Sequence, residues 1–441
     1  MRHTRRGRIT AGLAAIALVA VACGGGETAD TDEATETTDD TGDDGDEAAS
    51  GDDIPDAPNE GVDSDRINIG WMGDVTGPTA SAQVLNLSGT EAYFDMVNAD
   101  GGVLGRELNL IVKDDEYGAE LGVSNFQELL NDDRVLTIAH LGGSFIVDAV
   151  LPDAEREGLP LIVTGQTVNT SLASPYAFHL LGHYFDQADV SVARMLEEIP
   201  ADELRVGVAK LEVPSGDEWD IGVQKALDEQ GGEYVGNTSI SVSSPDAGAF
   251  ASSVQQMIDN EGMNYLAIHV APSSALFVVN TLASAGIEIP VIGMQGAASL
   301  NVFAEGDADQ LEITEGVHSY KTLADESEGA DEIRAFIEGE GASYADDAEH
   351  INFTAGWLVG MIIHNTLEKA AADSGEVNRE TFYEALQTAH DTKGLTCPVD
   401  WTERNDNPCA APFTSDGESM FMVGDFDQWA EVVTADYTLA D

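Results

Sequence analysis

Short apolar runs alternate with stretches of helical spacing along the middle of the chain. The strand-like runs are Ile67–Met72, Leu108–Val112, Val135–His140, Leu159–Val163, Val206–Ala209, Tyr265–Val270 and Pro290–Ile292. Stretches with helical spacing follow the first three of these, at Ser81–Asn98, Leu121–Leu130 and Ile146–Glu157. Strands that alternate with helices of about 10–15 residues are typical of βαβ units on a parallel sheet. The pattern therefore predicts an α/β fold with mainly parallel sheets.

The chain of 441 residues is too long for one such sheet. Two doubly wound lobes of about 190 residues each fit ordinary domain sizes. Ligands of open α/β sheets bind beyond the carboxyl ends of the strands, so two facing lobes place these ends at a common cleft. The residues that inform on function are then expected in the loops after the strands, at 73–78, 141–144, 164–167, 211–220, 271–274 and 294–297.

The N-terminus has the pattern of a secretory signal. Four arginines precede the apolar or small run Ile9–Ala22, and Cys23 follows it. The run is shorter than a membrane helix needs, so we interpret residues 1–22 as a signal peptide. Ala20-Val21-Ala22-Cys23 resembles the bacterial lipobox, with Ala20 where Leu is usual. That resemblance implies a diacylglyceryl group on Cys23 and anchoring at the extracellular face of the membrane; the alternative is a secreted protein with an incidental cysteine.

Residues 23–65 contain 17 acidic residues and neither Lys nor Arg. A segment with so few large apolar side chains cannot offset the entropy of ordering, which predicts a disordered acidic linker. Like charges extend such a chain, so it is either a tether that holds the folded part away from the membrane or a solvated tail without a role.

The charge balance restricts the possible partners. The whole chain has 81 acidic and 19 basic residues, a net charge of −62, which argues against nucleic acid as a partner. Residues 66–441 alone carry 64 acidic and 15 basic residues. Self-repulsion of this size is relieved by salt, so the composition predicts a high-salt environment.

Motifs for catalysis and metal binding are not found. The sequence has no HExxH, no cysteine pair beside a histidine, no G-x-S-x-G and no P-loop, so we expect neither an enzyme nor a metal or other cofactor. The histidines in or near strands are interpreted as satisfied core or rim residues: His140, His179, His183 and His269. Cys397 and Cys409 are 12 positions apart, and outside the cytoplasm we predict that they form a disulfide.

Candidate ligand-binding residues follow several strands. Leu141-Gly142-Gly143-Ser144 opens a helix, where free N–H groups and a hydroxyl suit an anion. The next loop, Thr164-Gly165-Gln166-Thr167, adds a hydroxyl and accessible backbone, so together the two loops predict a small-carboxylate site. Trp219 is either an apolar wall of the site or a side chain packed on its own lobe. Ser144 has the alternative of a simple helix cap, and Gln295 that of a turn residue.

An ordered series of short motifs carries a family resemblance. The series comprises Ile67–Gly77, Asn98–Arg106, Asp114–Tyr117, Gly142–Ser144, Gly158–Ile162, Ala285–Ile287, Ile292-Gly293 and Lys393–Thr396. In these residues the chain resembles the extracellular solute-binding proteins of branched-chain amino acid ABC transporters, over essentially all of 66–441. The resemblance implies two lobes joined by three crossovers that close on a ligand by hinge motion. The first lobe would comprise 66–183 and 318–394, and the second 184–317 and 395–441.

The resemblance also assigns roles by position. Ser144 matches the serine that binds the amino-acid carboxylate, and Gly165 and Thr167 match its partners in the next loop. Trp219 falls where a cleft tyrosine is common, and Ala271 lies close to the position of a second tyrosine. Gln295 stands where amino-acid binders have an acid for the ammonium group. A buried ammonium without a counter-charge is costly, so either a nearby acid (Asp217, Glu218 or Asp220) replaces it or the ligand has no ammonium.

The resemblance implies a lipid-anchored substrate-binding protein of an ABC importer. It would capture a small amino acid or a related carboxylate or amide in the inter-lobe cleft and deliver it to a permease. The alternative is a ligand-sensing receptor that passes its closed state to a signalling partner. An enzyme is disfavoured because the sequence offers no constellation of nucleophile and base.

Overall fold

Two separate sheets form the framework of the protein in a computed structural model, which describes residues 60–164, 168–297, 299–416 and 419–434. The first sheet is entirely parallel and has the order β2-β1-β3-β4-β5. Its strands are β1 (Arg66–Gly73), β2 (Glu107–Asp114), β3 (Ile138–Leu141), β4 (Leu161–Val163) and β5 (Ala177–His179).

The second sheet has the order β14-β13-β10-β9-β8-β6-β7. The members from β10 to β7 are parallel, and β13 and β14 form an antiparallel edge. Its strands are β6 (Arg205–Leu211), β7 (Glu233–Ile240), β8 (Tyr265–His269), β9 (Val291–Gly293), β10 (Thr314–His318), β13 (Ala411–Ser415) and β14 (Met420–Met422). A short antiparallel pair, β11 (Ala389–His390) and β12 (Val399–Asp400), stands apart from both. The predicted α/β class with mainly parallel sheets is confirmed.

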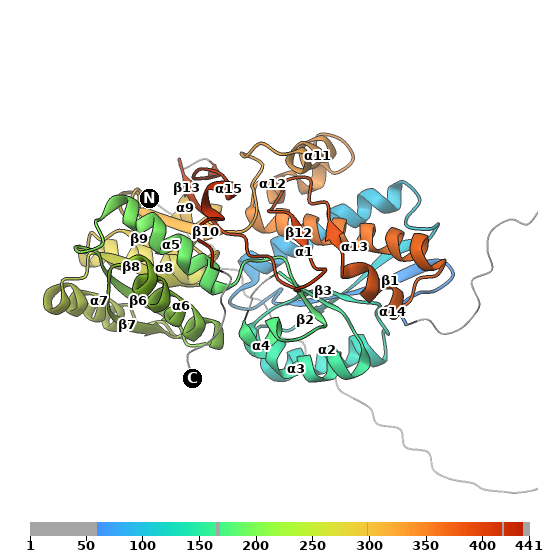
Figure 1. The fold of residues 1–441 in the computed structure, drawn as a ribbon, viewed down its shortest axis with the longest axis horizontal. Coiled ribbons are helices and arrows are strands. Elements are labelled where there is room, and N and C mark those ends of the chain that lie inside the picture. The colour runs from blue at the N-terminus through green and yellow to red at the C-terminus, as the bar shows by residue number, and fades with distance from the viewer. Residues whose placement is uncertain (1–59, 165–167, 298, 417–418, 435–441) are drawn as a thin grey trace, which may run out of the picture. The chain divides into compact units, whose positions relative to one another are not determined.

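Helices lie on both faces of each sheet (Figure 1). Those associated with the first sheet are α1 (Ala80–Ala99), α2 (Ala119–Asn131), α3 (Ser144–Glu157), α4 (Asn169–Leu172), α12 (Ala345–Ala348), α13 (Ile351–Ser374) and α14 (Arg379–Leu386). Those associated with the second are α5 (Tyr184–Glu198), α6 (Pro214–Gln230), α7 (Ala247–Glu261), α8 (Pro272–Ala285), α9 (Leu300–Glu305) and α10 (Ala308–Leu311). The remaining helical segments are α11 (Glu328–Ile337), the 3₁₀ turn at Ala342–Tyr344 and α15 (Phe426–Trp429).

The alternation of side chains along each strand explains why both sheets are covered on two sides. In β4, Leu161 and Val163 pack with residues of α2 and α3, whereas Ile162 packs in the cluster that contains α1 and α13. In β8, Leu266 and Ile268 pack toward α7 and α8, whereas Tyr265 belongs to the cluster of α5 and α6. Strands buried on both faces read as continuous apolar runs, which is why the sequence pattern revealed them.

The chain crosses between the two sheets three times, at 180–183, 319–327 and 401–410. The Ser319 hydroxyl links all three segments, because it accepts the Gly182 N–H at 2.8 Å and donates to the Cys409 carbonyl at 2.6 Å. Asn407 Nδ2 also donates to the Leu180 carbonyl at 2.8 Å. A Cβ at Gly182 would lie 2.2 Å from the Cys409 oxygen, so this close approach requires glycine. The crossovers therefore form one hydrogen-bonded hinge.

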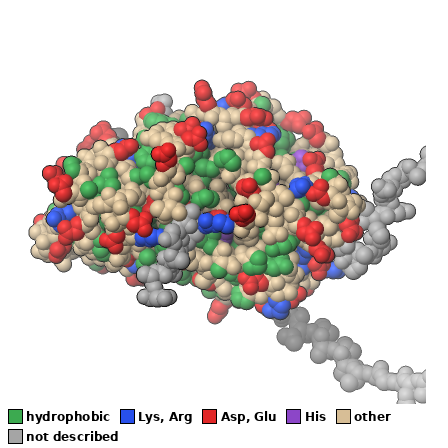
Figure 2. Space-filling view, in the orientation of Figure 1, with side chains coloured by type: hydrophobic (Ala, Val, Ile, Leu, Met, Phe, Trp, Pro, Cys, Tyr) green, Lys and Arg blue, Asp and Glu red, His purple; other side chains and the backbone are tan. Residues whose placement is uncertain are grey.

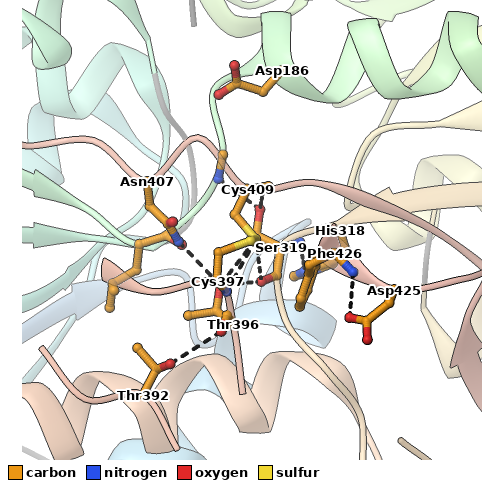
Figure 3. The surroundings of a disulfide bond; sticks show 12 residues. Asp186, His318, Ser319, Thr392, Thr396, Cys397, Asn407, Cys409, Asp425 and Phe426 are labelled. Carbon is orange, nitrogen blue, oxygen red and sulfur yellow. Dashed lines mark hydrogen bonds between the residues drawn. A yellow bond between two sulfur atoms is a disulfide. The ribbon is translucent and has the colours of Figure 1, made fainter. Parts of the chain in front are cut away.

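The structure contains the disulfide between Cys397 and Cys409 that the sequence predicts. Figure 3 shows it beside Ser319. The bond links the third crossover covalently to the chain around Thr396, whose hydroxyl donates to the Ser319 carbonyl at 2.6 Å. The cross-link closes a loop of 12 residues within the hinge.

Removing this disulfide is expected to destabilise the protein by about 3 kcal/mol, the loop-closure value for a loop of this length. Denaturant unfolding of the Cys397→Ser/Cys409→Ser variant measures the change, with unreduced wild type as its control. The cross-link would be contradicted by two free thiols per chain in a denatured, unreduced sample in which Cys23 alone has been replaced.

Several predicted elements differ in detail from the structure. The stretch 211–220, predicted as a loop, is mostly helical because Pro214 begins α6. Seven of the described strands were not predicted, namely β5, β7, β10, β11, β12, β13 and β14. Of these, β7 lacks a continuous apolar run and is largely half-exposed. Cys23 and the acidic segment 23–59 lie outside the described residues. In the part of the chain that the structure covers, no helix has the length and apolar character to cross a bilayer.

Candidate functional site

A cavity lies where the carboxyl ends of the strands of both sheets meet. It has a volume of about 790 Å³ with its open mouth included. Residues associated with the first sheet form one wall: Thr79, Ala82, Gln83, Asn86, Tyr117, His140, Gly143, Ser144, Thr164 and Asn352. Residues of the hinge and the second sheet form the other: Tyr184, Leu211, Ser215, His269, Val270, Ala271, Pro272, Met294, Gln295, Gly296 and His318. This is the place where the strand-end argument predicts a ligand.

A hydrogen-bonded network in the first wall joins the side chains of Gln83, Asn86, His140 and Thr164. Asn86 accepts from Trp71 Nε1 at 3.1 Å and donates to Thr164 Oγ1 at 3.3 Å. His140 bonds Thr164 Oγ1 through Nδ1 at 2.7 Å and Gln83 Oε1 through Nε2 at 3.2 Å. Because Gln83 Oε1 only accepts, His140 carries its proton on Nε2 and accepts from Thr164. The network fixes these side chains in place before any ligand enters.

His140 is also held neutral. It is 2% exposed and stacks on Trp71 with ring centroids 4.9 Å apart. Burial lowers the pKa of His140 to about 3. The first wall therefore presents a rigid, uncharged, hydrogen-bonded surface.

The second wall differs, because two buried histidines there lack partners. His269 ends β8 and His318 ends β10, and they are 2% and 1% exposed. Both ring nitrogens of His269 and the Nε2 of His318 have no hydrogen bond within the described part of the chain. Burial lowers the pKa of each to about 3, so both imidazoles are neutral. The ring nitrogens of buried His179 are likewise unpaired, but His179 lies away from the cavity, whereas His269 and His318 line it, where a bound ligand can supply the partner.

Six helices begin beside the cavity. A residue at the N-cap or in the first turn of each lines it: Thr79 of α1, Ser144 of α3, Tyr184 of α5, Ser215 of α6, Pro272 of α8 and Asn352 of α13. Only α5 has a side-chain cap, from His183; the N-caps of the other five make no such bond. The N-terminus of a helix carries a partial positive charge and unpaired N–H groups, so the convergence favours an anion.

Helix α3 shows how the sequence builds one of these ends. Gly143 is the N-cap with a φ of 76°, a conformation that glycine adopts without strain, and this places Ser144 at the first helical position. Ser144 Oγ donates to Ser215 Oγ at 3.4 Å, which joins the starts of α3 and α6 across the cavity. Two helix N-termini from opposite walls thus face each other at a pair of hydroxyls.

No Asp, Glu, Lys or Arg lines the cavity among the residues with described positions. Asp115 does not line the cavity, but its Oδ1 accepts the N–H of the lining residue Tyr117 at 2.8 Å. Burial, together with the charges of Asp74 and Asp114, raises the pKa of Asp115 to about 7. The same described range offers no group of three or more His, Cys, Asp or Glu residues arranged for a metal ion.

Of the predicted ligand-binding residues, Ser144, Ala271 and Gln295 line the cavity. Gly165, Gln166 and Thr167 lie outside the described residues. Trp219 does not line it; this side chain is fully buried in the core cluster that contains α5 and α6. The helix that replaces the predicted loop turns Trp219 inward, so it packs on its own lobe.

The three acids considered as substitutes for an ammonium partner are engaged elsewhere, and none lines the cavity. Asp217 and Asp220 both bond Lys210 Nζ, at 2.8 and 3.0 Å. Glu218 accepts from the Asn169 N–H at 3.0 Å and from His183 Nε2 at 3.1 Å. None of the three acids therefore faces the cavity in this structure.

Glu218 instead connects the two lobes, because it lies on α6 and Asn169 begins α4 beside the first sheet. Its side chain is 12% exposed, so these charge-assisted bonds are shielded from water. Ser273 Oγ also donates to the Pro78 carbonyl at 3.1 Å, from α8 to the loop before α1. The contacts across the cavity stabilise a closed arrangement.

Replacing Glu218 with Ala is expected to weaken ligand binding about 10-fold, mainly through faster dissociation, because a buried charged hydrogen bond contributes about 1.5–3 kcal/mol. Stopped-flow release of the bound solute measures this. Asp228→Ala removes the same charge from an exposed position of the same helix and serves as the control. Equal dissociation rates in the two variants would show that Glu218 does not hold the closed state.

The sequence did not identify the residues that dominate the cavity. His269 was interpreted as a core or rim residue, and His318, Tyr117, Tyr184, Gln83, Asn86 and Asn352 were not singled out. For His269 and His318 the one signal in the sequence is position, since each ends a parallel strand.

Comparison with known proteins agrees with this architecture. Three solved structures are similar in fold: a fatty acid ABC transporter substrate-binding protein from Thermomonospora curvata (21% identity, 85% of this chain and 95% of that one, TM-score 0.73); a branched chain amino acid ABC transporter protein from Thermus thermophilus with bound valine (17%, 82% and 96%, 0.72); and a solute-binding protein from R. palustris in complex with 4-hydroxybenzoate (17%, 83% and 99%, 0.70). A search of curated proteins found no significant match.

The family model described as periplasmic binding protein matches residues 66–414, a range that includes both sheets up to β13. The resemblance that the sequence motifs carry is thereby confirmed. The chain belongs to the periplasmic binding protein family and shares the fold of the solute-binding proteins of branched-chain amino acid ABC transporters.

Proposed function

We propose that the protein is the lipid-anchored substrate-binding component of an ABC importer. It captures a small amino acid, or a related carboxylate or amide, between its lobes at the extracellular face of the membrane and delivers it to a permease. The observation that carries the proposal is the cavity between two walls from different sheets, bridged by Ser144–Ser215 and Glu218–Asn169. A ligand that contacts both walls binds the closed state better than the open one, and this difference in affinity drives closure.

The proposal assigns binding without chemistry to the cavity. The one chain of a hydroxyl, an imidazole and an orienting group among the described bonds there is Thr164–His140–Gln83, and burial lowers the pKa of His140 to about 3, which makes it too weak a base to activate the hydroxyl. The bound solute should leave with its mass unchanged.

Mass spectrometry of the small molecules released from purified mature protein tests the function. We expect one solute at near-stoichiometric amount, which then binds ligand-free protein in calorimetry and reduces the radius of gyration in X-ray scattering. Uptake of that solute by cells that contain the neighbouring permease should require the protein. Binding and closure without any uptake would favour the sensor role, and a chemically altered solute would favour an enzyme.

The anchor has its own test. Cys23→Ser is expected to move the protein from the membrane fraction to the medium, because an acyl-bearing terminus is what holds it. Cys397→Ser, which changes a cysteine of the folded part, is the matched control and should stay membrane-bound. Unchanged membrane association of the Cys23 variant would refute lipidation at that residue.

A further inference from the structure

We propose that the solute is a carboxylic acid that lacks an ammonium group and carries a hydroxyl or carbonyl oxygen, which His269 and His318 hydrogen-bond. This inference rests on the proposed function and narrows it from amino acids, carboxylates and amides to one class. It is carried by three features of the cavity: its electrostatics, the saturation of one wall, and the two histidines of the other.

The electrostatics select against a positive charge on the ligand. The described lining has no carboxylate, and six helices direct their N-termini at the cavity. An ammonium group would meet positive helix ends without a counter-charge, which is costly in a buried site. A carboxylate meets the same ends favourably, and the Ser144–Ser215 hydroxyl pair from α3 and α6 marks where it can receive hydrogen bonds from both walls.

The network of Gln83, Asn86, His140 and Thr164 in the first wall has little hydrogen-bonding capacity left for a second polar group. Thr164 Oγ1 already bonds Asn86 and His140, and Gln83 bonds His140, the Asp74 N–H and Thr79 Oγ1. This network offers a ligand a preformed polar surface to pack against, but few new hydrogen bonds.

The second wall has the opposite character. His269 offers two unpartnered ring nitrogens and His318 offers its Nε2, while the His318 Nδ1 accepts the Ser319 N–H at 2.9 Å. Because the Nδ1 of neutral His318 accepts, its Nε2 carries the proton and is a donor. A donor at His318, and one donor plus one acceptor on neutral His269, suit an uncharged oxygen such as a hydroxyl or carbonyl. Leaving these buried groups unpaired is expensive, so a ligand that lacks the oxygen is discriminated against.

Two matched ligand sets test the charge rule by calorimetry on ligand-free protein. The aliphatic set is leucine, 4-methyl-2-oxopentanoate, 2-hydroxy-4-methylpentanoate and 4-methylpentanoate. The aromatic set is 4-(aminomethyl)benzoate, 4-hydroxybenzoate and benzoate. In at least one set the oxygen-bearing acid should bind 100-fold or more tightly than its ammonium-bearing counterpart, and 10-fold or more tightly than the plain acid. An ammonium-bearing member that binds as well as its counterpart, or a failure of all seven to bind, overturns the inference.

The role of the histidines is tested by the loss of selectivity. In His269→Gln and His318→Gln, the preference for the oxygen-bearing acid over the plain acid should fall by 10-fold or more. His179→Gln is the matched control, because this histidine also ends a strand and is fully buried but does not line the cavity. A ratio that stays at the wild-type value in both cavity variants refutes the assignment, whatever their stability.

Failure of this inference and failure of the proposed function are distinguishable. A zwitterionic or cationic solute recovered from the purified protein would overturn the ligand class and leave the transport role intact. Absence of any solute, together with absence of closure on adding cell-extract metabolites, would overturn both.

Discussion

Ser144→Asp is expected to weaken solute binding by at least 100-fold while leaving the fold intact. Ser144 is 2% exposed, lines the cavity and begins α3, and its hydroxyl lies 3.4 Å from that of Ser215. A carboxylate there occupies the place that we assign to the ligand carboxylate. Two like charges about 4 Å apart repel by about 4 kcal/mol at an effective dielectric of 20, which corresponds to a factor near 1,000 in affinity. The same charge is favourable at a helix start, so folding should not suffer.

Calorimetry with the recovered solute and thermal unfolding of the ligand-free variant together measure this result. Ser327→Asp is the control, since Ser327 caps α11 away from the cavity and receives the same charge at a helix start. Ser144→Ala, which removes only the hydroxyl, should cost about 10-fold, the value of one hydrogen bond to a charged group. Retained affinity in Ser144→Asp would place the ligand's charge elsewhere in the cavity.

The α/β fold could be predicted because the signals for its strands and helices lie in short segments of the sequence. Strands buried on both faces, such as β4 and β9, are apolar without interruption, and a glycine ends the helix before β4. The strand β7, half-exposed at the sheet edge, lacks that signal. Pro214 suits the first turn of a helix, but 211–220 was predicted as a loop because it follows a strand. This one difference explains why Trp219 lies in the core.

The sequence predicted where the site lies, but not which side chains line most of it. Gly143 and Ser144 were identifiable because a glycine followed by serine at a helix start has a local chemical meaning. The histidines have no such meaning: His140, His179, His269 and His318 all lie in parallel strands of buried residues. Only the tertiary arrangement saturates His140, removes His179 from the cavity and leaves His269 and His318 facing it without partners.

Gln295 lies in a cavity whose described lining contains no acid, so its neutral amide matches its surroundings. The amide is compatible with the bonds of the nearby acids of α6, since Glu218 bonds the start of α4 and Asp220 bonds Lys210, Tyr234 and Asn237. Gln295 itself lies in the second wall, where its N–H donates to Gln187 Oε1 at 3.0 Å. The chain is rich in Asp and Glu, yet none lies in the described lining of the cavity. The neutrality of the site therefore results from where the acids are placed in the fold and not from the composition of the chain.

The acidic surface predicts the second large effect: the melting temperature should rise by about 6–20 °C when NaCl is raised from 0.05 to 2 M. Figure 2 shows acidic side chains over most of the visible face, with fewer basic ones beside them. Residues 66–441 contain 64 acidic and 15 basic residues. At least eleven of these basic side chains already pair with acids, so most carboxylates have no partner of opposite charge.

Screening relieves this repulsion because the Debye length falls from about 10 Å at 0.1 M salt to about 3 Å at 1 M. Relief of about 3–5 kcal/mol in a lobe of this size raises the melting temperature by about 2–4 °C per kcal/mol. Differential scanning calorimetry of the mature chain in NaCl, and in choline chloride at equal ionic strength, should give the same early rise, since both screen alike. Sucrose stabilises by exclusion from the surface and not by screening, so it should not reproduce the steep rise below 0.5 M. A melting temperature that is flat or falls with salt would mean that the carboxylates of the folded state repel no more strongly than those of the unfolded chain.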